Sequence, residues 1–127
     1  MGKTIALIDD SSVMRSILRK AILMSDVEVE DFLEAANGAE GFEVIKQHAD
    51  NLDVIFTDLD MPERGGVQMM RELRDSGITN IPIVIVSTVG DNKMQETCKE
   101  LGAVAFLRKP FSHEDIRELL SNVGGGS

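Results

Sequence analysis

The stretch that most constrains the fold is 54–62, where an uninterrupted apolar and β-branched run ends at two carboxylates, Asp58 and Asp60. Such a run suits a strand buried on both faces, as in a parallel sheet, and the Met-Pro pair after it cannot continue regular structure. In parallel sheets the ligand crevice lies beyond the carboxyl ends of the strands. Asp58 is therefore expected at a crevice, where it could bind a metal, act as a nucleophile or cap the next helix.

Strand-like and helical segments alternate along the whole chain. Strands are predicted at 4–8, 32–35, 52–57, 81–86 and 103–107. Helices are predicted from a Ser11-Ser12 cap to about Met24, at 39–48, 67–74 and 91–101, and after a Ser112 cap, with an apolar stripe at 116, 119, 120 and 123. The apolar face of the first helix is predicted to consist of Val13, Ile17, Ala21 and Met24.

Five strand–helix units with short connections predict an α/β fold, a doubly wound five-stranded parallel sheet with helices on both faces. The common strand order for this class is the flavodoxin-like 2-1-3-4-5, which places the ends of strands one and three side by side. Residues 1–123 are interpreted as one domain, and 124–127 as a flexible Gly/Ser tail. The predicted order brings together five polar residues that are far apart in sequence: Asp9, Asp10, Asp58, Ser87 and Lys109.

Composition excludes several classes of function. The 127 residues include 13 Lys and Arg against 22 Asp and Glu, a formal net charge of -9. Direct binding of nucleic acid is not expected, because it normally needs a basic surface. No apolar stretch reaches membrane-spanning length. The single cysteine, Cys98, cannot form an internal disulfide, so a cytoplasmic location fits best.

The residues of the predicted crevice favour phosphoryl chemistry. Clustered carboxylates cannot all stay ionised in a partly dry site unless a cation joins them or one takes up a proton. An all-oxygen ligand set suits Mg²⁺, which also bridges carboxylate and phosphoryl oxygens. Lys109 adds a positive charge and Ser87 a hydroxyl donor. Asp58 is then the natural nucleophile, and its product would be an aspartyl-phosphate.

Several short motifs occur in order on the expected strand ends. They are 9–15 (Asp-Asp-Ser-Ser-Val-Met-Arg), Asp58 with Met61-Pro62 and Gly66, Pro82 followed five positions later by Ser87, and Lys109-Pro110-Phe111. In these motifs the chain resembles bacterial two-component response-regulator receiver domains, in particular the stand-alone chemotaxis type. The resemblance covers roughly residues 4 to 123.

The resemblance implies a role for each carboxylate. Asp58 would accept a phosphoryl group from a sensor histidine kinase or a phosphotransfer protein. Asp10 and Asp58 would bind Mg²⁺ through their side chains, Asp9 would act through water, and Asp60 would contribute its backbone carbonyl. The protein would then be a signalling phosphoprotein and not an enzyme acting on external substrates.

The resemblance also implies how the signal would leave the site. Lys109 would pair with the phosphoryl oxygens, Ser87 would swing to hydrogen-bond one of them, and Phe106 would turn inward behind it. The surface of the fourth helix, fifth strand and fifth helix would change its affinity for a downstream effector. The Lys109–Pro110 peptide bond is expected to be cis. Asp60 and Val89, both flanking the site, are hypothesised to tune the lifetime of the phosphorylated state.

Two alternatives share part of this pattern. Asp58 and Asp60 after an apolar strand also resemble the nucleophile and general acid of Mg²⁺-dependent haloacid-dehalogenase-type phosphatases. In those enzymes, however, the nucleophile strand comes early and the other acids follow it, whereas Asp9 and Asp10 precede Asp58 here. A flavodoxin would need a phosphate-binding loop after the first strand, where the acidic pair would repel the flavin phosphate.

Overall fold

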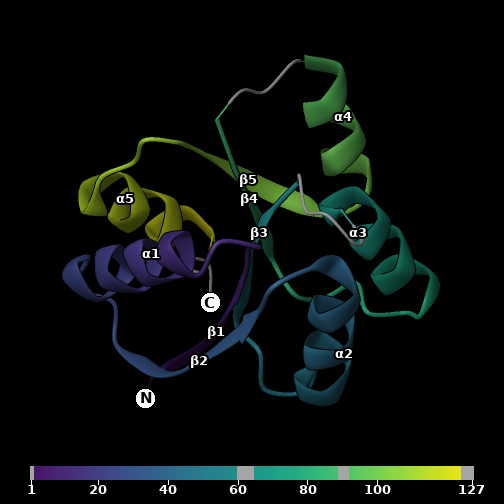
Figure 1. Cartoon of the computed structure of the whole chain (residues 1–127), viewed down its shortest axis with the longest axis horizontal. Helices are drawn as coiled ribbons and strands as arrows, with labels where there is room; N and C mark the ends of the chain where they lie inside the picture. Colours follow the sequence, from purple (N-terminus) through teal and green to yellow (C-terminus); the bar gives the residue numbers. More distant parts are fainter. Residues whose placement is uncertain (1, 60–64, 89–91, 124–127) are drawn as a thin grey trace.

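The computed structural model describes residues 2–59, 65–88 and 92–123, and within them it has three layers, with helices on both faces of a central sheet (Figure 1). The strands are β1 (Lys3–Ile8), β2 (Val29–Ala35), β3 (Val54–Asp58), β4 (Ile83–Ser87) and β5 (Ala103–Arg108). The helices are α1 (Ser12–Met24), α2 (Gly38–His48), α3 (Gly66–Asp75), α4 (Asn92–Glu100) and α5 (His113–Val123).

The sheet confirms the predicted order. All four strand pairings are parallel, and the order is β2-β1-β3-β4-β5. The central strands are apolar because both of their faces are covered: Ile55 and Phe56 of β3 are completely buried. Since every strand runs in the same direction, all five carboxyl ends lie along one edge of the sheet, and residues that follow a strand meet there.

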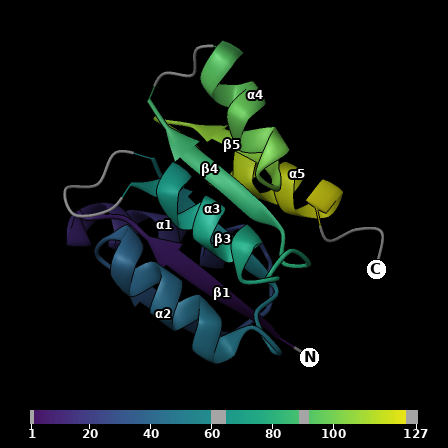
Figure 2. The same ribbon diagram turned by 90° about the vertical axis from the view of Figure 1, so that its right-hand side faces the viewer.

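Two separate apolar cores hold the helices against the sheet. One core joins α2, α3 and α4 to one face and includes Ile45, Met69 and Cys98. The other joins α1 and α5 to the opposite face and includes Leu18 and Ile116. Figure 1 shows α1 and α5 on one side of the strands, and Figure 2 shows α2 and α3 side by side on the other. The expected covering of both faces is confirmed.

The predicted apolar face of α1 is wrong at three of its four residues, and only Ala21 packs against the core as expected. Val13, Ile17 and Met24 are 67%, 48% and 52% exposed, while Leu18 and Ile22 are completely or almost completely buried. The reason is that α1 carries apolar residues on more than one side, so the spacing alone permits two alternative stripes. The stripe that packs is the one facing Ile5 and Leu7 of the sheet and α5, where more apolar area leaves water.

Truncation at the two stripes is expected to have very different effects on stability. Ile22→Ala should lower the free energy of unfolding by about 2 to 5 kcal/mol, because it opens a cavity beneath α1. Ile17→Ala should stay within about 0.5 kcal/mol of the parent, because that side chain already contacts water. Urea unfolding of both variants measures the difference. Equal losses would contradict the observed orientation of α1.

Four strands begin at other residues than predicted, and β1 differs least, since it starts at Lys3 instead of 4. β2 starts at Val29 instead of 32, because its first half carries exposed acidic residues that hide it from an apolar pattern, although it pairs with β1. β3 and β4 start two residues later than predicted, at Val54 and Ile83. Pro82 cannot donate to a strand pairing, which delays β4, although its carbonyl accepts from the Ile55 N–H at 2.9 Å.

The predicted helix caps are confirmed. The Ser11 hydroxyl accepts a hydrogen bond from the Met14 N–H at 3.1 Å. Ser112 accepts one from the Asp115 N–H at 3.1 Å, and the Asp115 carboxylate accepts from the Ser112 N–H at 2.9 Å, which is a capping box. None of the helices in the described ranges has both the length and the apolar character that a membrane crossing requires.

Burial raises the pKa of the Cys98 thiol above its ordinary value of 9.0. The unfolded chain therefore loses this proton first as the pH rises, so the thiol's contribution to stability is complete below 9.0 and falls above it. We expect urea midpoints measured about one pH unit below and above this value to drop more for the parent than for Cys98→Ala. Equal drops would contradict this assignment.

Candidate functional site

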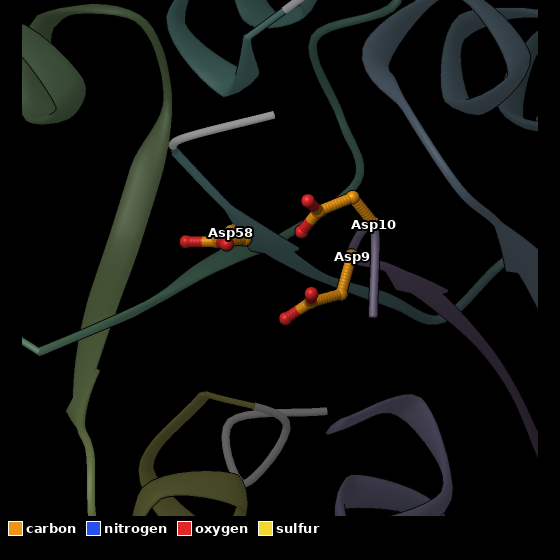
Figure 3. Close-up of side chains that lie close together, drawn as sticks. All are labelled: Asp9, Asp10 and Asp58. Atoms are coloured by element: carbon orange, nitrogen blue, oxygen red, sulfur yellow. The ribbon is translucent and has the colours of Figure 1, made fainter. Parts of the chain in front are cut away.

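The predicted crevice lies at the carboxyl edge of the sheet. Asp9 and Asp10 directly follow β1, Asp58 is the last residue of β3, and Lys109 directly follows β5. One oxygen from each of the three carboxylates lies within 4.8 Å of the others, and Figure 3 shows the three side chains gathered in one space. Asp9 is buried, Asp58 is partly buried and Asp10 is exposed, so the cluster opens to solvent on the Asp10 side.

The backbone and side chain of Asp9 are held at several atoms. Its N–H donates to the Ala35 carbonyl at the end of β2, at 3.1 Å. Its Oδ1 accepts from the Ser11 N–H at 2.9 Å, and its carbonyl oxygen accepts from Arg15 Nη1 at 2.5 Å. These bonds leave Oδ2 buried and without a hydrogen bond.

Asp58 is oriented by the turn that follows β3. Its Oδ1 accepts a hydrogen bond from the Leu59 N–H at 2.8 Å, and its backbone carbonyl accepts from the Thr57 hydroxyl at 2.9 Å. The side chain is only 13% exposed. Asp58 therefore presents a fixed carboxylate at the centre of the sheet edge, with its two oxygens in different surroundings.

Lys109 faces the carboxylates from the other side of the crevice. Its Nζ lies 3.6 Å from Asp9 Oδ2 and 3.9 Å from Asp58 Oδ2. Its backbone N–H donates to the Ser87 carbonyl at 2.8 Å, which ties the ends of β4 and β5 together. The Lys109–Pro110 bond is cis, as the resemblance implied. Lys109 offsets part of the negative charge, but one ammonium cannot balance three carboxylates.

The cluster fits a hard divalent cation. Its donors are all oxygens, which is the ligand type that Mg²⁺ prefers. A buried carboxylate oxygen without a hydrogen bond is costly, and a metal ion would satisfy Asp9 Oδ2. The site is also open on the Asp10 side, which leaves room for the water ligands that Mg²⁺ usually keeps.

Ser87 and Phe106 share a hollow between β4, β5 and α4. Ser87 ends β4, and Phe106 on β5 is half-buried against the core of the α4 face. Both line a cavity of about 300 Å³, together with Gln95 of α4. A hollow beside a half-buried ring gives that ring space for another position. Asp60 and Val89, which the sequence also singled out, lie outside the described residues.

Sequence reasoning missed one element of this site. Arg15 of α1 donates from Nη1 to the Asp9 carbonyl and from Nε to Glu34 Oε1 of β2, at 2.9 Å. Glu34 also pairs with Arg19. Arg15 stood in a recognised motif, but nothing in the sequence connects it to a carboxylate 19 positions away. Only the pairing of β2 with β1 brings the two residues together.

Comparison with known proteins decides the family. Residues 5–121 match the family described as the response regulator receiver domain. The chain belongs to this family. It is 35% identical over 119 residues to the chemotaxis protein CheY1 of Helicobacter pylori, covering 93% of this chain and 94% of that protein. It is 30% identical over 123 residues to the chemotaxis protein CheY of Halobacterium salinarum, covering 97% and 98%.

Solved structures agree with this membership. CheY4 of Vibrio cholerae superposes with a TM-score of 0.82 at 26% identity, covering 97% of this chain and 99% of that one. The chain is thus a CheY-like receiver domain, a phosphoacceptor switch in signalling. The alternative of a haloacid-dehalogenase-type phosphatase finds no support in these matches, which follow the receiver pattern over almost the entire chain.

Proposed function

We propose that Asp58 is the phosphoacceptor of this receiver domain, with Mg²⁺ held by Asp10 and Asp58, and by Asp9 through water. The observation that carries the proposal is the convergence of three carboxylates and Lys109 at the carboxyl edge of the sheet. Asp58 is the central carboxylate, since β3 lies between β1 and β4. The donor phosphohistidine would belong to a sensor histidine kinase or a phosphotransfer protein.

In the transfer, an Asp58 carboxylate oxygen attacks phosphorus and forms the O–P bond of an acyl phosphate. The P–N bond of the donor breaks, and its electron pair stays on the imidazole nitrogen. Mg²⁺, when bound, supplies positive charge next to the phosphoryl oxygens. Lys109 supplies a second positive charge, and it stands 3.9 Å from Asp58 already. The Ser87 hydroxyl donates a hydrogen bond to one phosphoryl oxygen.

The output follows from the new charge at the end of β3. The Lys109 ammonium would exchange its contacts with Asp9 and Asp58 for the phosphoryl oxygens. The Ser87 side chain would turn to donate a hydrogen bond to one of the same oxygens. Phe106 would then fill the hollow that it shares with Ser87. The surface of α4, β5 and α5 would shift its population between two forms, with different affinities for a downstream effector. We place this exchange in the cytoplasm, where the lone thiol of Cys98 would stay reduced.

Intact mass spectrometry tests the proposed function directly. Incubation with acetyl phosphate and Mg²⁺ should add the mass of one phosphoryl group to the protein, and an excess of EDTA should prevent the addition. The same sample should release no steady product from p-nitrophenyl phosphate. Sustained hydrolysis of that ester without an adduct, or an adduct that forms equally well in EDTA, would contradict the proposal.

A further inference from the structure

The Glu34–Arg15–Asp9 chain of contacts connects an edge strand to the metal-binding loop. The Arg15 side chain is only 15% exposed, whereas Glu34 stays in contact with water. The guanidinium uses two different nitrogens, Nε toward Glu34 and Nη1 toward the Asp9 carbonyl. The planar guanidinium is thus anchored by Glu34 of β2 and donates a hydrogen bond to the loop that follows β1.

The carbonyl that Arg15 contacts belongs to the peptide unit between Asp9 and Asp10. A peptide unit is planar, so a hydrogen bond to its oxygen restricts the orientation of the plane that also contains the Asp10 Cα. The Asp9 N–H is tied to Ala35 and the Asp9 carboxylate to the Ser11 N–H, and the Arg15 bond adds a restraint on the carbonyl between Asp9 and Asp10. Asp10 is exposed and lies at the open side of the cluster. The Arg15 bond therefore acts on the peptide unit from which the Asp10 carboxylate projects.

We propose that Arg15, anchored by Glu34, is a positioning residue that sets the geometry of the Asp9–Asp10 pair and thereby the affinity for Mg²⁺. This inference rests on the proposed function, because it takes the carboxylate cluster to be a Mg²⁺ site. The side-chain bonds of Arg15 go to Glu34 and the Asp9 carbonyl, so its role is to position and not to coordinate. Partners that orient metal ligands in this way typically change affinity by about 10- to 100-fold when they are removed.

Electrostatics alone predicts the opposite sign, which makes the inference testable. Arg15 is a positive charge close to a cation site, so its removal would strengthen Mg²⁺ binding if charge were its only effect. If Arg15 instead positions the Asp9–Asp10 pair, its removal would weaken Mg²⁺ binding. Arg15→Lys sharpens the comparison, because it keeps the charge but a single ammonium cannot replace the fork that joins Glu34 to the Asp9 carbonyl.

The experiment is a titration with MgCl₂ followed by ¹H–¹⁵N NMR of the full chain, which gives the Kd from the amide shifts. We expect binding at least about 10-fold weaker for Arg15→Ala and clearly weaker for Arg15→Lys. Arg15→Lys should add little loss in a Glu34→Gln background, because both changes break the same chain of contacts. Arg74→Ala is the matched control: it also removes one guanidinium, but from the last turn of α3, at the far end of the domain.

The outcomes separate this inference from the proposed function. Parent-like or tighter binding by Arg15→Ala, with saturable binding by the parent, would overturn the positioning role and leave the Mg²⁺ site intact. No saturable binding by the parent would overturn both. Urea unfolding of each variant in EDTA reports any general loss of stability separately. A drop in affinity for Arg15→Lys without a drop in the urea midpoint would support positioning specifically.

Discussion

Asp58→Asn is expected to abolish formation of the phosphoryl adduct while leaving the fold intact. The amide has nearly the same shape, and its oxygen can still accept the hydrogen bond from the Leu59 N–H. It is not a nucleophile, however, so no acyl phosphate can form. Removing one of three clustered charges also relieves repulsion, so the urea midpoint measured in EDTA should stay unchanged or rise.

The measurement is intact mass after acetyl phosphate and Mg²⁺, combined with urea unfolding. Asp75→Asn serves as the control, because it removes the same charge from an exposed site at the end of α3. That variant should take up phosphoryl groups as the parent does. An adduct that persists in Asp58→Asn would show that another side chain is the acceptor, and peptide mapping would then locate it.

Gly66→Ala is expected to slow phosphoryl uptake by about 100-fold, because it displaces the acceptor residue. A Cβ at this position would overlap the backbone carbonyl oxygen of Asp58 and would stand 3.2 Å from the Leu59 Cα. Both neighbours are backbone, so the clash cannot be relieved by rotating a side chain. The turn that carries Asp58 must move, or α3 must begin elsewhere. A loss of about 1 to 3 kcal/mol in stability should accompany the defect.

Gly102→Ala distinguishes a displaced acceptor from a merely weakened fold. Gly102 has φ +112° and no neighbour that a Cβ would touch, so alanine there strains only its own backbone. It precedes β5 at the amino edge of the sheet, opposite the site. Comparable destabilisation with normal uptake by Gly102→Ala, measured as the rate of mass gain, is expected. If both variants slow equally, the close approach of Gly66 to Asp58 has no special role.

The convergence of the site could be predicted because it depends on few choices. Apolar runs locate the strands, and one common strand order places Asp9, Asp58 and Lys109 at a single edge. Small errors in strand boundaries do not alter that result. The carboxyl ends of the parallel strands lie along the same edge whether β2 begins at 29 or at 32. The strand order and the residues that follow each strand could therefore be predicted from the sequence.

The orientation of α1 and the anchoring of Arg15 could not be predicted, for a shared reason. Each depends on how an element is rotated or registered against a neighbour distant in sequence. α1 offers apolar side chains in two directions, and only packing against the sheet and α5 selects Leu18 and Ile22. Glu34 reaches Arg15 only because β2 lies beside β1 in one particular register. Local pattern does not contain that information.

The position of β3 within the sheet has a mechanical consequence. Asp58 ends the central strand of the sheet, which is hydrogen-bonded to β1 on one side and to β4 on the other. β5 is bonded to β4 alone. A phosphoryl group added at Asp58 is therefore carried by a strand that is paired on both sides, which has less room to move than an edge strand. We expect the resulting displacement to be largest along β5, an edge strand that leads directly into Lys109, whose Nζ lies 3.9 Å from Asp58 Oδ2.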